Sequence, residues 1–486
     1  MATKHFITTP IYYVNGEPHI GHAYTTVAAD VLARFWRERD GAKSVFFLTG
    51  TDEHGTKVAI KAKELGKDTK QFTDEIAGQF KAAWQTLEIS NDFFIRTTDV
   101  AHMSAVQEIL KRLKAAKTPQ GRDAIYESMY TGPYCVGCEK FLTVKDLIDG
   151  KCAIHKTIPD QLEEKNWFFR LSDYLPQVRT AIEKGEMRIH PEERKNETLG
   201  LFGQGIDDFS ISRSTVTWGV AIPWDPSQRA YVWLDALSNY ITALGYPDDS
   251  KRVKEWWTGA DVHQLMAADI LKFHAVYWPA LLLALGLPVP KHLHVHGYFT
   301  IDGEKMSKTT GNVIKPIELV SKFGVDATRY LLLSQFSFGY ESDVRAEDFV
   351  TKYNADLANG LGNLLARVTN MIEKSLGGKV TRKIHGAPTL KIVGAAIEKL
   401  NFREALLGIW KLIDLSNEYI DAEKPWALAK SDPRKLAPIL GELADDLHAI
   451  AGALRPFMPR TAEKIEKALT ARPIVKYSGL FARIEG

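Results

Sequence analysis

The most constraining feature of the sequence is an apolar segment, a tight turn and an amphipathic helix near the start of the chain. Residues His5 to Val14 are rich in Ile, Tyr and Thr and end at the Asn15-Gly16 pair, which predicts a strand followed by a turn. From Ile20 onward, apolar residues recur every three or four positions, as in a helix with one buried face, and Ser44 to Leu48 is a second candidate strand. Strand, helix and strand at this spacing predict a parallel sheet with right-handed crossovers.

The remaining chain changes its pattern three times. Its 486 residues exceed what one hydrophobic core organises, so several domains are expected. Short β-like runs such as Arg213 to Trp218 follow, and the α/β pattern then returns in Tyr231 to Leu237, a predicted helix Ile270 to Leu285 and a predicted strand His292 to Phe299. We predict a Rossmann-like domain in two halves, 1–117 and 225–344, an inserted domain in 118–224, and an all-α helical bundle in 345–486.

The composition is that of an ordinary globular protein. Lys and Arg number 62 against 60 Asp and Glu, a net charge of +2, so a surface for nucleic acid would have to be local. Residues Met1 to Pro10 show no secretory pattern, and the apolar run Trp278 to Leu285 is far shorter than the roughly 20 residues that cross a bilayer. We therefore expect a cytoplasmic chain with no membrane partner.

A first candidate site lies where the first strand's turn opens into a helix. The segment Pro18-His19-Ile20-Gly21-His22 places free backbone N–H groups and the positive end of the helix dipole together. His19 and His22 share one helix face and can both donate to an anion, and Gly21 leaves room for a flat base against the backbone. Two histidines near a helix start can also have a purely structural role.

A second candidate site is a lysine-rich loop, Glu304 to Thr309, between Gly303 and Gly311. Glycine hinges allow a loop to close, and Lys305 and Lys308 can then neutralise charge on a triphosphate during displacement at its α-phosphate. A solvated basic turn is the simpler alternative for such a loop taken alone. Together with the histidine motif, the loop favours a nucleotide-activating site.

The three cysteines point to a metal. Cys135-x₂-Cys138-x₁₃-Cys152-x₂-His155 supplies three thiolates and one imidazole, which is enough to close a tetrahedral shell around one structural Zn²⁺. An odd number of cysteines is a poor basis for a disulfide framework. Free thiols are the alternative.

The two loop motifs resemble the His-Ile-Gly-His and Lys-Met-Ser-Lys-Ser signatures of class I aminoacyl-tRNA synthetases, with Thr309 in place of the last Ser. Over nearly the whole chain the sequence most closely resembles methionyl-tRNA synthetases of the bacterial type. This resemblance rests on Pro10 to Gly16, Gly50 to Thr56, Tyr231 to Ala236 and Phe273 to Ala280. It implies a methionine–tRNA ligase that forms methionyl-adenylate and pyrophosphate from ATP with Mg²⁺ and then charges the 3′-terminal ribose of tRNA(Met).

The resemblance also implies roles for individual residues. The catalytic residues would be His19, His22, Lys305 and Lys308, and the ATP-binding residues would be His19, Gly21, His22, Asp269, His296, Gly297, Lys305 and Lys308. The methionine-binding residues would be Ile11, Tyr13, Asp52, Trp233, Ala236, Leu237, Tyr240, Phe273, His274 and Trp278. Asp52 would hold the substrate ammonium, aromatic walls suit a polarizable thioether, and one polar contact from Tyr240 or His274 would orient the sulfur.

One departure from the family pattern lies near the ATP ribose. Where the family has Gly-Lys-Asp-Ile, this chain has Ala267-Ala268-Asp269-Ile270. Asp269 keeps the carboxylate for a ribose or amino-group contact. A Cβ must now be accommodated where glycine allows the backbone to approach closely.

The C-terminal bundle carries the predicted tRNA contacts. Asn363 and Arg367 are four apart on one helix face, and Trp426 follows Pro425 at a predicted helix entry. By resemblance these three residues would read the anticodon, since Arg and Trp both stack on unpaired bases. A surface polar pair and a core tryptophan are the alternatives. Because the chain ends at Gly486 without a further tRNA-binding domain, we expect a monomer.

Three other functions deserve comparison with this hypothesis. Ligases for leucine, isoleucine and valine resemble it but are usually much longer because of an editing insert, and the cysteine enzyme carries zinc in its active site. A catalytically inactive RNA-binding paralogue conflicts with the presence of His19, His22, Asp52, Lys305 and Lys308. A small-molecule nucleotidyltransferase of the same superfamily would not need the C-terminal bundle.

Overall fold

The computed structural model describes residues 3–137, 140–142, 147–153, 156–301, 303–305, 313–381 and 388–485. The chain forms two compact units, each built from several stretches of sequence. Unit 1 consists of Met1–Pro18, Asp40–Ala82 and Asn91–His296, and unit 2 consists of His19–Arg39, Ala83–Ser90 and Gly297–Gly486. This division does not follow the expected domain boundaries near residues 117, 224 and 344, which stay predictions.

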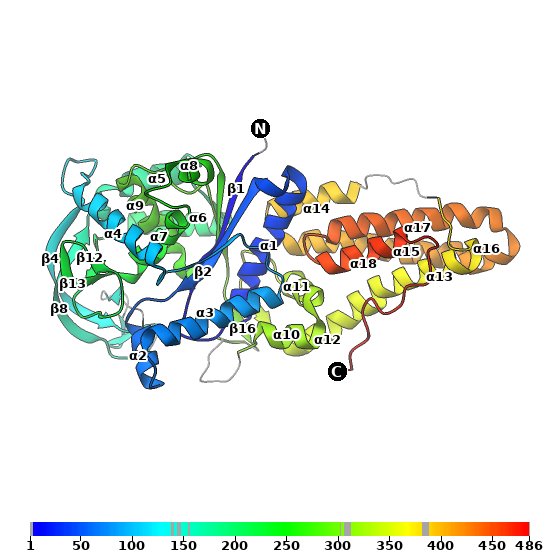
Figure 1. Cartoon of the computed structure of the whole chain (residues 1–486), viewed down its shortest axis with the longest axis horizontal. Coiled ribbons are helices and arrows are strands. Elements are labelled where there is room, and N and C mark those ends of the chain that lie inside the picture. Colours follow the sequence, from blue (N-terminus) through cyan, green and yellow to red (C-terminus); the bar gives the residue numbers. More distant parts are fainter. Residues whose placement is uncertain are drawn as a thin grey trace. The chain divides into compact units, whose positions relative to one another are not determined.

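Unit 1 is built on a parallel sheet, as the fold class predicted from the sequence requires (Figure 1). Its strands, in spatial order, are β3 (Phe93–Arg96), β2 (Val45–Asp52), β1 (His5–Tyr13), β14 (Asp261–Ala267), β15 (His292–His296) and β9 (Arg188–His190). All neighbouring strands pair in parallel. All eight residues of β2 are buried, which explains why its first half, Val45 to Leu48, is continuously apolar instead of alternating.

Helices connect and follow these strands. They are α2 (Thr56–Glu64), α3 (Thr69–Thr86), α4 (Val100–Ala115), α7 (Val232–Thr242) and α8 (Ser250–Val253). The helix that follows β1 along the chain, α1 (Ile20–Asp40), belongs to unit 2 except for Asp40. The predicted strands at His5 and Ser44 and the predicted helix from Ile20 are thus confirmed as β1, β2 and α1. The apolar core of unit 1 lies against the sheet and includes Phe6 and Leu48, both fully buried.

The stretch 118–224 is β-rich, as expected. Two long antiparallel strands, β4 (Ile125–Cys135) and β8 (Asp160–Phe169), run side by side in Figure 1. The shorter strands are β5 (Lys140–Phe141), β6 (Leu147–Ile148), β7 (Lys151–Cys152), β10 (Phe209–Ser210), β11 (Ser212–Arg213), β12 (Ala221–Ile222) and, just beyond the stretch, β13 (Asp225–Ala230). Two helices, α5 (Leu175–Glu183) and α6 (Glu192–Gly203), and β9 of the main sheet also fall here, and the sequence analysis did not anticipate them.

The predicted strand Arg213 to Trp218 is wrong beyond Arg213, where β11 ends. Loop contacts hold the rest of this segment instead of a strand ladder. The carbonyl of Trp218 accepts a hydrogen bond from the Gly55 N–H at 3.1 Å, and its indole N–H donates to the Glu53 carbonyl at 2.7 Å. A segment whose polar groups are satisfied in this way has no need of a neighbouring strand.

The predicted helix Ile270 to Leu285 is helical but irregular. It consists of a 3₁₀ turn at Ala268–Ile270, a π-helical turn at Phe273–Tyr277 and α9 (Trp278–Ala284). Pro279 lies in the first turn of α9 and lacks the N–H that an unbroken α-helix would direct to residue 275, so the preceding turn widens. The predicted strand His292 to Phe299 is likewise divided, into β15 and β16 (Phe299–Ile301).

Unit 2 is mainly helical beyond residue 345, which confirms the predicted C-terminal helices. A small sheet orders β17 (Glu304–Lys305), β16 and β18 (Ser342–Val344). The helices are α10 (Pro316–Phe323), α11 (Val325–Ser334), α12 (Ala346–Lys352), a π-helical stretch Tyr353–Gly362, α13 (Asn363–Leu376), α14 (Pro388–Glu398), α15 (Phe402–Glu423), α16 (Pro425–Ser431), α17 (Pro433–Leu454) and α18 (Pro459–Thr470). No helix within the described ranges is long and apolar enough to cross a membrane.

A buried ion pair fixes the centre of unit 2. Arg329 of α11 and Asp30 of α1 lie 2.7 Å apart and both are fully buried. Burial by itself would raise the pKa of Asp30, but the guanidiniums of Arg329 and Arg34 lower it below its usual range. Arg329 also donates to the carbonyls of Phe457 and Pro456, at 2.8 Å and 3.0 Å. These hydrogen bonds from the guanidinium offset the cost of removing the charged Arg329 side chain from water, as a buried ion pair requires.

Candidate active site and tRNA-contacting residues

The proposed ammonium ligand lies at the carboxyl ends of two parallel strands of unit 1. Tyr13 of β1 and Asp52 of β2 are register partners, and the Val14 N–H donates to the Asp52 carbonyl at 3.0 Å. Asp52 is buried. This edge of an open parallel sheet is where ligands of α/β folds bind. Ile11 precedes the same strand end and packs against the core of unit 1.

An aromatic cluster of α7 and the segment before α9 contains the proposed side-chain pocket residues. The rings of Trp233 and Phe273 stack with centroids 3.8 Å apart and planes 6° apart. Tyr240 and Trp278 are tilted toward each other at 6.0 Å, and Trp278 is almost fully buried. Ala236 and Leu237 are buried on the same helix as Trp233. The structure thus brings together the predicted residues of α7 with those of the 273–278 segment.

One hydrogen-bonded pair closes this cluster. The His274 Nδ1 lies 3.0 Å from the Ile270 carbonyl, so this nitrogen must carry the ring proton, and Nε2 then accepts from the Tyr240 hydroxyl at 2.7 Å. Burial lowers the pKa of His274 to about 4, so the ring is neutral at pH 7. Both protons of the pair are used within the protein. Neither group therefore has a proton to direct at a thioether sulfur in this arrangement.

Two buried charge networks support the loop after Asp52, and the sequence analysis missed both. The Glu53 carboxylate is fully buried. Its two oxygens accept hydrogen bonds from Nε and Nη2 of Arg96, at 2.6 Å and 2.7 Å. The next residue, His54, contacts Asp235 of α7 at 2.7 Å, and Asp235 also contacts His102 at 2.9 Å. Burial raises the pKa of Asp235, but His54 and His102 lower it to about 2. A charged residue within an apolar run, as in Tyr231 to Leu237, was the available signal.

The histidine motif lies in unit 2, at the start of α1. The two imidazoles of His19 and His22 stack with centroids 3.6 Å apart. Each Nδ1 faces a backbone N–H: His22 accepts from the His19 N–H at 3.3 Å, and His19 accepts from the Gly21 N–H at 3.2 Å. In the neutral rings the proton is therefore on Nε2, which makes Nε2 the donor that an anion requires.

The remaining predicted ATP residues are distributed along the chain. Asp269 is exposed in the 3₁₀ turn that follows β14, and His296 is buried at the end of β15. A Cβ on Gly297 would meet the Tyr340 and Glu341 backbone at 2.4 Å, so packing requires glycine there whatever binds nearby. Lys305 belongs to β17. Lys308 lies outside the described residues.

The predicted zinc ligands are only partly described. Cys135 ends β4 and Cys152 ends β7, and both are almost fully buried, while Cys138 and His155 lie outside the described residues. Among described residues, the two cysteines and Leu142 form a small cluster of their own, with Leu147 packed against it. Two buried cysteines in one cluster are suitable thiolate ligands for a structural ion.

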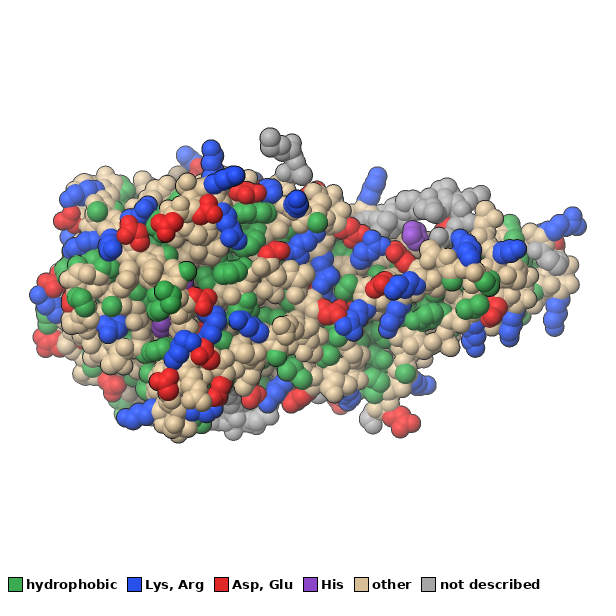
Figure 2. Space-filling view, viewed as in Figure 1, with side chains coloured by type: hydrophobic (Ala, Val, Ile, Leu, Met, Phe, Trp, Pro, Cys, Tyr) green, Lys and Arg blue, Asp and Glu red, His purple; other side chains and the backbone are tan. Residues whose placement is uncertain are grey.

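The predicted tRNA-contacting residues all lie in the helical part of unit 2. Asn363 is exposed at the start of α13, and Arg367 one turn later pairs with Asp421 at 2.6 Å. Trp426 is 51% exposed on α16, and α16 contacts α13. Exposed basic residues surround this helix, namely Lys424, Lys430, Arg434 and Lys435. Figure 2 shows Lys and Arg side chains along this helical region, which supplies local positive charge despite the small net charge.

Comparison with known proteins agrees with this arrangement. The family described as tRNA synthetases class I (M) matches residues 5–145 and 138–369, and the anticodon-binding domain of tRNA ligases matches residues 387–479. A parallel-sheet unit with helices beyond it, and these two matches, define a class I aminoacyl-tRNA synthetase.

Individual relatives identify the branch of that class. A methionine–tRNA ligase of Caldanaerobacter subterraneus is 44% identical and covers 96% of this chain and 74% of its own. That of Streptomyces coelicolor is 40% identical over 97% and 90%. The structure of Mycobacterium tuberculosis methionyl-tRNA synthetase with methionyl-adenylate aligns with a TM-score of 0.87 at 36% identity, over 96% and 94%. The chain belongs to the methionine–tRNA ligase family and is an aminoacyl-tRNA ligase.

Proposed function

We propose that this ligase activates methionine at the carboxyl edge of the unit 1 sheet, with Asp52 holding the substrate ammonium. The observation that carries the proposal is a buried carboxylate at the ends of β1 and β2 in a unit that also holds a stacked aromatic wall, Trp233 on Phe273. An ammonium is desolvated favourably only beside an opposite charge, and a thioether packs well on aromatic faces. The other predicted methionine-binding residues complete the proposed site: Ile11, Tyr13, Ala236, Leu237, Tyr240, His274 and Trp278.

The proposed chemistry is attack by the methionine carboxylate on the α-phosphate of ATP. It needs positioning and charge stabilisation more than a protein nucleophile. His19 and His22 would donate from Nε2 to phosphate oxygens, and Lys305 and Lys308 would neutralise the charge that develops on the leaving pyrophosphate. Enzymes of this class use ATP with Mg²⁺, which shares that neutralisation. The methionyl group then passes to the terminal ribose of tRNA(Met).

A pair of carboxamide variants tests the assignment. Asp52→Asn should raise the KM for methionine by about 100-fold or more, since a charge-assisted contact is worth roughly 1.5–3 kcal/mol and burial increases it. Asp269→Asn, the matched control, should raise the KM for ATP instead. Pyrophosphate exchange with each of the twenty amino acids measures both. If Asp52→Asn left the KM for methionine unchanged, or another amino acid were preferred, the proposed site would be wrong.

We also propose that Cys135, Cys138, Cys152 and His155 hold one structural Zn²⁺. The ion would tie β4 to β7 through Cys135 and Cys152 and supply no catalytic step. Freshly purified protein should contain about one zinc per chain by the four-ligand count. Cys152→Ser should lose the zinc and make residues 130–160 sensitive to protease. The control variant Ser128→Ala should keep the zinc and stay resistant to protease. Metal-free native protein with a folded insert would contradict the proposal.

We also propose that the chain acts in the cytoplasm and as a monomer. The relatives are translation enzymes, which supports the cytoplasm as the site of action. Light scattering of the purified chain, with a mass near 54.5 kDa expected for a monomer, tests the predicted assembly state.

A further inference from the structure

A cluster of histidines lies at the amino ends of the unit 1 strands, the edge of the sheet opposite to the proposed methionine site. His263 of β14 is the register partner of His292 of β15, and His294 follows two residues later on the same face. The ring centroids of His263 lie 4.6 Å from those of His292 and 5.4 Å from those of His294. The function described above uses none of these three side chains.

The nitrogens of this cluster are placed as metal ligands are. Within the described ranges, one ligand atom from each of the three imidazoles lies within 4.8 Å of the others. His263 Nδ1 and His294 Nε2 are 3.1 Å apart, close to the roughly 3.3 Å between two nitrogens that share a tetrahedral ion at about 2.0–2.1 Å. The other His263 nitrogen, Nε2, is buried and has no hydrogen-bond partner among the described residues. An ion held at Nδ1 does not reach Nε2 of the same ring, so the site rests on the facing nitrogens of His263 and His294, whose shared hydrogen bond the ion would replace.

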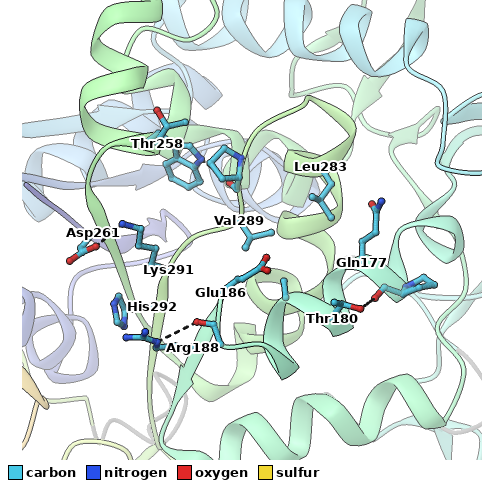
Figure 3. A pocket seen from close by; sticks show the side chains of 15 residues that line it. Gln177, Thr180, Glu186, Arg188, Thr258, Asp261, Leu283, Val289, Lys291 and His292 are labelled. Carbon is cyan, nitrogen blue, oxygen red and sulfur yellow. Dashed lines mark hydrogen bonds and ion pairs between the residues drawn. The ribbon is translucent and has the colours of Figure 1, made fainter.

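The cluster is reached from a cavity. His263 and His294 are buried, but His292 is half-buried and lines a cavity of about 900 Å³. Figure 3 shows His292 beside Arg188, Asp261 and Lys291, at the starts of β9, β14 and β15. The cavity contains none of the residues predicted to bind methionine or ATP. An ion can therefore enter, and a solvent molecule can complete its coordination shell, without passing the active site.

The protonation and charge of the surroundings decide which ligand suits the cluster. Burial, followed by the neighbouring histidines, lowers the pKa of all three imidazoles, and Arg188 and Lys291 lower that of His292 further, so each ring is neutral and presents a lone pair. Lys291 is paired with Asp261 at 2.7 Å, and exposed Arg188 also acts on His292 with its positive charge. That charge weakens cation binding and favours a hydroxide or another small anion as the fourth ligand.

We propose that His263, His292 and His294 form a second metal site, for a first-row divalent ion that prefers imidazole, such as Zn²⁺, Ni²⁺ or Cu²⁺. Three neutral imidazoles and one open position suit this group of metals and not the oxygen-seeking Mg²⁺ or Ca²⁺. The bound ion links β14 to β15 across the sheet. Because it binds only the folded chain, it stabilises unit 1 by an amount that grows with the logarithm of its free concentration.

Cobalt provides a probe that separates this site from the cysteine ligands. The protein as purified, with its resident metal measured first, is titrated with Co²⁺. We expect one further equivalent with visible d–d bands, no thiolate-to-cobalt charge-transfer band, and a raised Tm. No additional equivalent, or one with a thiolate band, would overturn the proposal.

Two variants and a matched control assign the ligands. His292→Gln and His294→Gln should each weaken the additional cobalt by more than the roughly 10–100-fold that loss of an outer-shell partner costs. His190→Gln removes an exposed ring that stacks on His294 at 5.2 Å but lies outside the ligand group, and should keep the cobalt. Pyrophosphate exchange should be unchanged in all three, which shows that they are folded. Unchanged cobalt affinity in both ligand variants would refute the site.

Discussion

A single hydrogen bond between Tyr240 and His274 limits what the methionine pocket can offer its substrate. Because His274 directs its Nδ1 proton to the Ile270 carbonyl, its Nε2 must accept, and the Tyr240 hydroxyl proton is used there. The sequence suggested that Tyr240 or His274 orients the substrate's sulfur. In the structure both groups use their protons within the protein, so they contribute only the shape of the pocket wall. Selection of methionine would then depend on shape and on sulfur–aromatic contact with Trp233 and Phe273, worth about 0.3–1.5 kcal/mol per ring.

Tyr240→Phe tests this interpretation directly. The ring stays, but a buried His274 Nε2 loses its donor, so the stability of unit 1 should fall by about 1–3 kcal/mol. The KM for methionine should change by less than about tenfold, because only the wall's support is altered. Tyr174→Phe is the control, since that buried ring makes only a long 3.4 Å bond to the Lys117 carbonyl. A large loss of methionine affinity at unchanged stability would show that the Tyr240 proton serves the sulfur.

At the scale of elements, helix α16 presents an exposed tryptophan, Trp426. Lys424 takes a left-handed conformation with φ of 47° between α15 and α16, so the chain turns sharply and Pro425 starts the new helix. Trp426 next to it is 51% exposed, so its indole is accessible to a ligand. Trp410 of α15 is its structural opposite, 8% exposed and stacked on Tyr330 at 4.3 Å.

The two tryptophans should therefore respond differently to truncation. Trp426→Ala should weaken aminoacylation of tRNA(Met) by about 10- to 100-fold, since stacking one base on an aromatic ring is worth roughly 1–3 kcal/mol, while pyrophosphate exchange and Tm stay near wild type. Trp410→Ala should instead destabilise the helical bundle by about 3–5 kcal/mol. Parallel loss of both activities in Trp426→Ala would mean that the anticodon contact lies elsewhere.

Elements whose residues repeat locally could be predicted, and elements fixed by distant partners could not. The stripe Leu361, Leu364, Leu365, Val368 and Ile372 is fully buried, as helical spacing implied. The strand expected through Trp218 fails because Trp218 is held by Glu53 and Gly55, more than 160 positions earlier. Likewise His54 and Asp235 meet across 181 positions, a pairing that no local pattern contains. The predicted site residues were found by resemblance, and the supporting networks beneath them needed the fold.

At the scale of the whole molecule, unit 1 holds an unusual number of buried neutral histidines. His263, His274 and His294 are each less than a tenth exposed, and half-buried His292 adjoins them in the sheet. Burial is the first cause of the lowered pKa in every case, with mutual repulsion next for the sheet cluster, and the pKa of His274 and of His292 falls to about 4. In the unfolded chain each returns to an ordinary value near 6.5.

Unit 1 should therefore lose stability in mild acid. Above about pH 7 neither state binds these protons, but as the pH falls from 6.5 toward 4 only the unfolded chain takes them up. Each ring that stays neutral in the folded chain removes up to roughly 1.4 kcal/mol of stability per pH unit near pH 5.5. Carboxylates with a lowered pKa, such as Asp235 at about 2, reduce the stability only below this pH range.

Urea midpoints of chelator-treated protein, followed by tryptophan fluorescence from pH 8 to 4.5, measure how steeply stability falls with pH. His294→Gln should make this dependence shallower by about one proton. A midpoint that stays constant between pH 6.5 and 5 would show that these imidazoles are charged in the folded chain.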